Sequence, residues 1–80
     1  MVDSALKEQI LKKCYESYKK TGLAKAEFVF GFDNAIRQNY FDTLDDMYHD
    51  GLIKPNYAAL GMAVVVLTNS GINLAQSIFN

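Results

Sequence analysis

Residues 51–72 read GLIKPNYAALGMAVVVLTNSGI, and this stretch decides the fold. Residues 62–67 (MAVVVL) are uncharged and rich in β-branched side chains, which is typical of a strand. An exposed strand of this kind would pair with other chains, so we expect it to be the central or most covered strand. Pro55 limits the preceding arm to an edge or short strand, and residues 58–61 (AALG) are the expected turn. The stretch therefore predicts a β-hairpin.

A helix is predicted directly after the hairpin. Thr68 is placed to cap its N-terminus, and Leu67 and Ile72 have the spacing of a hydrophobic staple. Gly71 weakens the first turn without preventing it. The apolar stripe of this helix consists of Ile72, Ala75, Ile78 and Phe79. Because the stripe runs almost to the last residue, the helix is expected either to pack on a second copy of the chain or to use Phe79 to cover its own core.

A second long helix is predicted over residues 33–50, with Asp33 as its N-cap and Gly51 after its last turn. Five residues share one apolar face of this helix, namely Ile36, Tyr40, Leu44, Met47 and Tyr48. Their spacing of about 3.6 residues per turn indicates a face that packs on the core.

A further helix is predicted over residues 3–21, with Ser4 as the N-cap candidate and Gly22 after its end. Its wide apolar stripe consists of Leu6, Ile10, Leu11, Cys14, Tyr15 and Tyr18. Between these two helices, the stretch 23–32 is ambiguous. Residues 27–30 (EFVF) alternate like a short strand, but residues 25–30 ended by Gly31 favour a short helix, which is our expectation.

Length and composition bound the function. The chain has 80 residues and a net charge of -1, which indicates one domain over residues 1–80 and excludes a generally basic nucleic-acid-binding surface. With one cysteine and one histidine it forms no internal disulfide and no closed zinc site, so no cofactor is expected. The N-terminal residues are not typical of a signal peptide, and the longest near-apolar run, 57–67, is too short to span a membrane. We expect a cytoplasmic protein without membrane contact.

The order of these elements resembles a winged helix-turn-helix domain. The helix exit YHDGLI at 48–53 is similar to the end of a winged-helix recognition helix, the hairpin at 54–66 to its wing, and LTNSGI at 67–72 to the step into the final helix. The resemblance implies an α+β, winged-helix-like fold with three main helices, a short extra element and a β-hairpin wing. It also implies a small DNA-binding regulator of bacterial or phage type, binding duplex DNA through the 33–50 helix.

Under this resemblance, the first half of the 33–50 helix would enter the major groove, where Asn34, Arg37 and Gln38 would read base edges. The phosphate contacts would come from Lys19, Lys20, Lys25 and Lys54. The second half of the helix carries acidic residues that repel phosphate, namely Asp42, Asp45, Asp46 and Asp50. The alternative is that these polar residues only solvate an exposed helix and that the lysines serve solubility and the helix dipole.

A second function class stays open, a protein-interaction module on the same scaffold without DNA binding. The expected wing tip, NYAALGM at 56–62, is uncharged and would suit a protein partner better than phosphate. The two classes differ in whether the basic residues share one face or are scattered. Cys14 is expected to be a buried structural thiol and His49 a solvated side chain, and the absence of catalytic motifs argues against an enzyme. A homodimer with the first and last helices in its interface is expected, because a core of this length is marginal.

Overall fold

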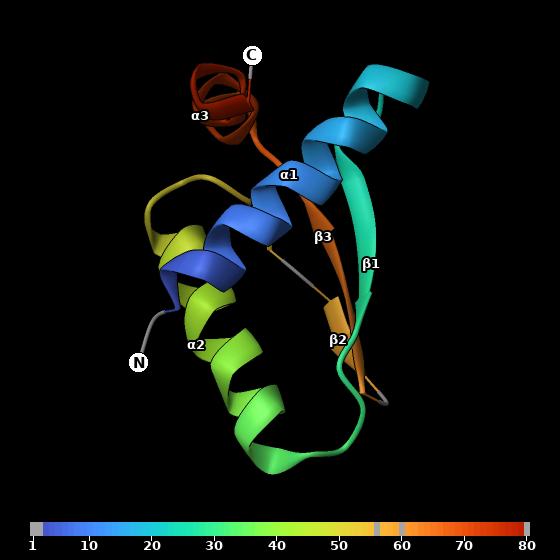
Figure 1. Ribbon diagram of the computed structural model, residues 1–80, viewed down its shortest axis with the longest axis vertical. Coiled ribbons are helices and arrows are strands. Elements are labelled where there is room, and N and C mark those ends of the chain that lie inside the picture. Colours follow the sequence, from blue (N-terminus) through green and yellow to red (C-terminus); the bar gives the residue numbers. More distant parts are fainter. Residues whose placement is uncertain (1–2, 56, 60, 80) are drawn as a thin grey trace.

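A computed structural model of the chain describes residues 3–55, 57–59 and 61–79, with the side chains of all of these except 57–59. In chain order, the elements are α1 (Ser4–Thr21), β1 (Lys25–Val29), α2 (Asn34–His49), β2 (Tyr57–Ala59), β3 (Met62–Val66) and α3 (Asn69–Phe79), as Figure 1 shows. The described residues therefore combine three helices with an antiparallel hairpin, β2–β3, in an α+β arrangement, as the sequence predicts.

The three strands form one antiparallel sheet in the order β1-β3-β2. The uncharged strand β3 is in the centre, which confirms the prediction that it is the central strand. Its partner β1 pairs in a register that places Lys25 opposite Val66 and Val29 opposite Met62. Both edges of β3 are therefore hydrogen-bonded, and its backbone is not available to another chain.

The expectation of a short helix at 25–30 is wrong, because residues 25–29 form the strand β1. Burial alternates along it: Ala26 and Phe28 are buried, whereas Lys25, Glu27 and Val29 are exposed. This alternation at a period of two residues arises because one face of β1 packs on the core and its backbone pairs with β3.

The turn of the hairpin is also shorter than the predicted 58–61. Ala58 and Ala59 belong to β2, which pairs with β3, while Gly61 has a φ of 77°. Gly61 also lies against the backbone of Gly31, since a Cβ atom on Gly61 would be 2.8 Å from the Gly31 carbonyl oxygen. The expected wing tip falls on 56–62, of which Asn56, Leu60 and the side chains of 57–59 lie outside the described residues.

The helices cover one face of the sheet (Figure 1). Helix α1 contacts β1 and also packs against both α2 and α3. Ile10 of α1 and Val65 of β3 are both fully buried in the core beneath it. No helix in the described part of the chain covers the opposite face of the sheet, to which we refer as the open face. It carries the outward side chains of β1 and β3, namely Lys25, Glu27, Val29, Met62, Val64 and Val66.

The core-facing side of α2 is narrower than predicted. Leu44 and Met47 are buried, but Ile36 and Tyr48, at the two ends of the predicted face, are 48% and 46% exposed. Thr43, which the apolar pattern does not include, is fully buried instead. On α3, Phe79 packs against the chain's own core while Ile78 is 46% exposed.

Asp3, rather than the expected Ser4, caps α1, and it also joins α1 to α2. Its Oδ1 accepts a hydrogen bond from the backbone N–H of Leu6 at 3.1 Å. Its Oδ2 accepts one from Asn39 Nδ2 at 3.0 Å, and its own backbone N–H donates to Thr43 Oγ1 at 3.3 Å. Two hydrogen bonds with α2 therefore favour Asp3 as the cap, and a pattern of neighbouring residues in the sequence cannot predict such contacts.

The residues just after α2 pack directly on the start of α3. Gly51 and Leu52 donate their backbone N–H groups to the carbonyls of Tyr48 and Met47, which is the Schellman pattern of a helix end. Thr68 caps α3 by accepting from the Gly71 N–H at 3.1 Å, as predicted. A Cβ atom on Gly71 would lie only 2.1 Å from the Leu52 carbonyl oxygen, so this contact requires glycine.

We expect Gly71→Ala to lower the free energy of unfolding by about 3 kcal/mol, because the added methyl group separates α3 from the end of α2. The matched control is Ser70→Ala, one residue earlier and exposed, which should change stability by less than about 0.5 kcal/mol. Urea unfolding followed by circular dichroism measures both. Equal stability of the two variants would contradict the packing of α3 described here.

The pH dependence of stability is expected to depend on Asp3. The hydrogen bond from Asn39 and that from the Leu6 backbone lower the pKa of Asp3 below its usual value of 3.8. A carboxyl whose pKa is lowered in the folded state stabilises the protein above its unfolded pKa, and this contribution is lost as the pH falls through the folded pKa.

Asp3→Ala should therefore be less stable than the unmodified protein at pH 6, and the difference should shrink below pH about 4. Thermal unfolding between pH 2 and pH 7 measures the difference, with Glu8→Ala, an exposed residue on α1, as the control. A difference that stays constant over this whole range would show that the ionised carboxylate does not stabilise the fold.

Candidate interaction surfaces

Four lysines gather at one end of the molecule. Lys19 and Lys20 are in the last turn of α1, and Lys25 begins β1. Lys25 lies opposite Val66 in the sheet, and the backbone N–H of Lys54 donates to the Val66 carbonyl at 2.9 Å, so these two lysines flank the end of β3. All four lysines are exposed. The phosphate-binding residues expected from the sequence are therefore brought together.

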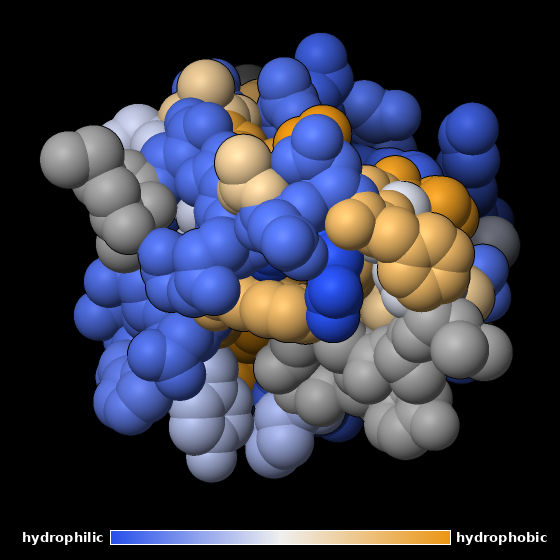
Figure 2. Space-filling view, turned by 90° about the horizontal axis from the view of Figure 1, so that it is seen from below, coloured by the Kyte–Doolittle hydropathy of each residue, from blue (hydrophilic) through white to orange (hydrophobic). Residues whose placement is uncertain are grey.

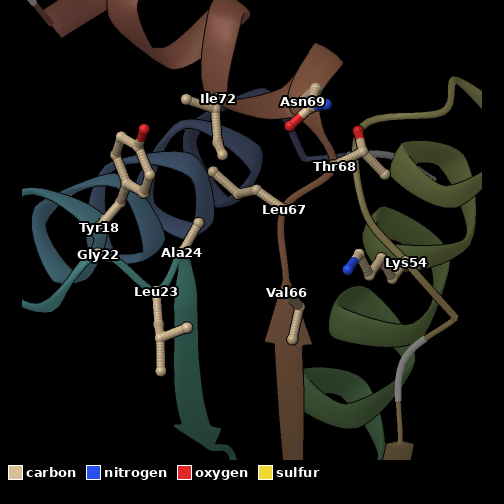
Figure 3. A pocket seen from close by; sticks show the side chains of 10 residues that line it. All are labelled: Tyr18, Gly22, Leu23, Ala24, Lys54, Val66, Leu67, Thr68, Asn69 and Ile72. Atoms are coloured by element: carbon tan, nitrogen blue, oxygen red, sulfur yellow. The ribbon is translucent and has the colours of Figure 1, made fainter.

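A shallow pocket opens at this lysine-rich end. Tyr18 and Leu23 lie on one side of it, Lys54 and Asn69 on the other, and Leu67 at its base (Figure 3). Lys54 is the one charged side chain that lines the pocket within the described residues. The rest of its lining is apolar or uncharged.

The base-reading residues expected from the sequence are elsewhere. Asn34, Arg37 and Gln38 are in the first turns of α2, and this end of α2 lies at the opposite end of the molecule's longest axis from the last turn of α1 (Figure 1). That axis is 33 Å long. The structure therefore divides the seven candidate DNA-binding residues into two groups, one at each end.

Two of the three base-reading candidates also contact other side chains of α2. The guanidinium carbon of Arg37 is 5.7 Å from the centre of the Phe41 ring, and its Nε is buried without a hydrogen-bond partner among the described residues. Gln38 Nε2 donates to Asp42 Oδ1 at 2.8 Å. Reading a base would require both side chains to leave these contacts, whereas Asn34 is exposed.

The acidic end of α2 is partly neutralised from within the chain. Lys7 of α1 lies 3.7 Å from a carboxylate oxygen of Asp46 and of Asp50. His49 Nδ1 lies 2.8 Å from the backbone carbonyl of Asp45, and this contact, together with the Asp45 carboxylate, raises the pKa of His49. When protonated, His49 also suits the C-terminal end of a helix, where the helix dipole favours a cation.

A further feature of the surface, which was not predicted from the sequence, is a group of exposed apolar side chains. Val29, Phe32 and Ile36 are 76%, 73% and 48% exposed, and they follow one another where β1 passes into α2. We call these three residues the apolar end. Figure 2 views the molecule from below and shows apolar side chains among mostly hydrophilic ones. If residues 25–29 are interpreted as a strand, the alternation of their side chains between the two faces predicts that Val29 is exposed to solvent.

Cys14 is fully buried, and its Sγ lies 3.7 Å from the Val65 carbonyl oxygen. Desolvation by burial raises the pKa of this thiol to about 12, which leaves it protonated and unreactive at neutral pH. Within residues 3–55, 57–59 and 61–79, no group of three or more His, Cys, Asp or Glu side chains is arranged to hold a metal ion. In the same residues, no helix is both long and apolar enough to cross a membrane.

Comparisons of this chain with protein-family models, with curated proteins and with solved structures found no match.

We expect the Cys14 thiol to resist modification while the protein is folded. At pH 8, Ellman's reagent should react with the folded protein only as slowly as the protein unfolds, because only the thiolate is nucleophilic and the buried thiol stays protonated. In 6 M guanidinium chloride, where the thiol is exposed, the reaction should be immediate. Absorbance at 412 nm follows both reactions. Rapid reaction of the folded protein would contradict the burial of this residue.

Proposed function

We propose that this protein is a protein-interaction module on a winged-helix-like scaffold, which binds a partner through its open sheet face and apolar end. The observation that carries the proposal is the exposure of Val29 and Phe32, at 76% and 73%, beside a sheet face without a covering helix in the described residues. These residues are close in the chain where β1 passes into α2, and exposed apolar side chains that gather at a surface are typical of sites that bind other proteins.

The winged-helix-like scaffold is supported by the second half of the chain. Helix α2 ends at Gly51 in a Schellman pattern, the hairpin β2–β3 follows, and Thr68 caps α3. The first half supports the interaction function instead, because the strand β1 takes the place of the short helix expected before α2 and adds an edge strand to the sheet.

Photo-crosslinking tests this proposal. Phe32 is replaced by p-benzoylphenylalanine in cells that express the protein, and the same replacement at the exposed Gln76 of α3 is the control. We expect a crosslinked protein of discrete mass from position 32 and none from position 76, because only the former lies on the proposed surface. Equal crosslinking at both positions, or none at either, would contradict the proposal.

DNA binding is the second candidate, and the four lysines that share one end favour it. Each phosphate contact lowers the logarithm of affinity by about 0.9 per decade of salt, so four contacts would reduce affinity about 100-fold between 50 and 200 mM salt. Fluorescence polarisation with a mixed-sequence duplex measures this change. The interaction-module proposal predicts no saturable binding at either salt concentration, and a steep salt-dependent affinity would replace it with DNA binding.

A further inference from the structure

The strand β1 has a free edge in the described part of the chain. The backbone N–H of Leu67 donates to the Ala24 carbonyl, and that of Phe30 donates to the Gly61 carbonyl, each at 2.9 Å. The backbone N–H and C=O groups of the even-numbered residues in this segment therefore point toward β3. Because bonded positions alternate along an antiparallel pair, the backbone groups of Lys25, Glu27 and Val29 point away from β3. The contact from Lys13 Nζ to the Glu27 carbonyl at 2.8 Å agrees with this direction.

A free edge can pair with the same edge of a second copy about a two-fold axis. Only registers that place outward-facing residues opposite each other form backbone hydrogen bonds. A register centred on Lys25 or on Glu27 would place like charges directly opposite each other, which is unfavourable. A register centred on Ala26 places Lys25 opposite the partner's Glu27, and the reverse pair follows by symmetry.

The register centred on Ala26 also matches the apolar residues. It places Leu23 opposite the partner's Val29, and the symmetric pair follows. These two side chains are 65% and 76% exposed in the single chain. Ala26, at the centre of the register, has the small side chain that a close approach of two strands needs. In this one register, each charged residue therefore faces an opposite charge on the second copy, and each apolar residue faces an apolar one.

We propose that β1 pairs with β1 of a second copy in this register, which joins two three-stranded sheets into one. This inference rests on the proposed function, since it names a second copy of the chain as the partner and places it at the edge of β1, beside the open sheet face. It places the dimer interface on β1 rather than on the first and last helices, where the sequence led us to expect it.

Lys13 competes with a second strand for this edge. Its ammonium group donates a hydrogen bond to the Glu27 carbonyl oxygen and lies 4.9 Å from the centre of the Phe28 ring. Pairing replaces its bond with one from the backbone N–H of the partner's Lys25. A lysine that covers an edge strand in this way lowers the tendency of the strand to pair. Lys13→Ala should therefore strengthen the dimer.

Sedimentation velocity between 1 and 500 µM tests the pairing. We expect a reversible change from 9.0 kDa to twice that mass, about 18 kDa. Lys25→Glu and Glu27→Lys should each weaken the dimer about tenfold, because each turns both attractive cross-strand pairs into repulsive ones. The double variant Lys25→Glu with Glu27→Lys should restore the affinity, since it exchanges the charges and keeps them opposite. Lys12→Glu and Glu8→Lys, exposed residues of α1 outside the proposed pairing, are the charge-matched controls and should leave the affinity unchanged.

The possible outcomes are distinct. A protein that stays at 9.0 kDa at 500 µM overturns the pairing, but a crosslinked partner of another mass at position 32 would still support the interaction module. A dimer that is insensitive to both single charge reversals overturns the β1 interface and favours the helices. A double variant that fails to restore a dimer weakened by the single variants overturns the register.

Discussion

The rest of the structure depends on β3, an uncharged strand that must be paired along both edges and covered on at least one face. Strand β1 and the short β2 satisfy its two edges, and α1 covers its inner face, where Ala63 and Val65 are fully buried. The pairing with β3 forces residues 25–29 into an extended conformation despite their mixed local pattern. Since the helices lie on one side of the sheet, no described element covers the open face or the outer edge of β1.

This one-sided arrangement also places the charged residues. Because α1 and α2 pack against each other through Asp3, Asn39 and Thr43, the last turn of α1 and the first turn of α2 are directed to opposite ends of the molecule. The lysines and the base-reading candidates are separated for that reason. A surface that reads DNA needs both groups along one groove, whereas a protein partner needs only the apolar contacts around Val29 and Phe32.

Features that depend on neighbouring residues could be predicted from the sequence. The caps Asp33 and Thr68, the glycines after α1 and α2, and the central strand β3 are set by local chemistry. Features that depend on distant contacts could not. Residues 25–29 become a strand only through β3, and Asp3 replaces Ser4 as the cap because Asn39 and Thr43 hold it. The division of the candidate site follows from the angle between two helices, which no single segment encodes.

The central claim is that β1 is an edge strand that presents alternate backbone groups outward. Amide hydrogen exchange by NMR tests it most directly at low micromolar concentration, where the proposed dimer is expected to be dissociated. We predict slow exchange for Ala26 and Phe28, which bond β3, and fast exchange for Lys25, Glu27 and Val29. Equal protection of all the amides from 26 to 29, as in a helix or a fully covered strand, would contradict the account.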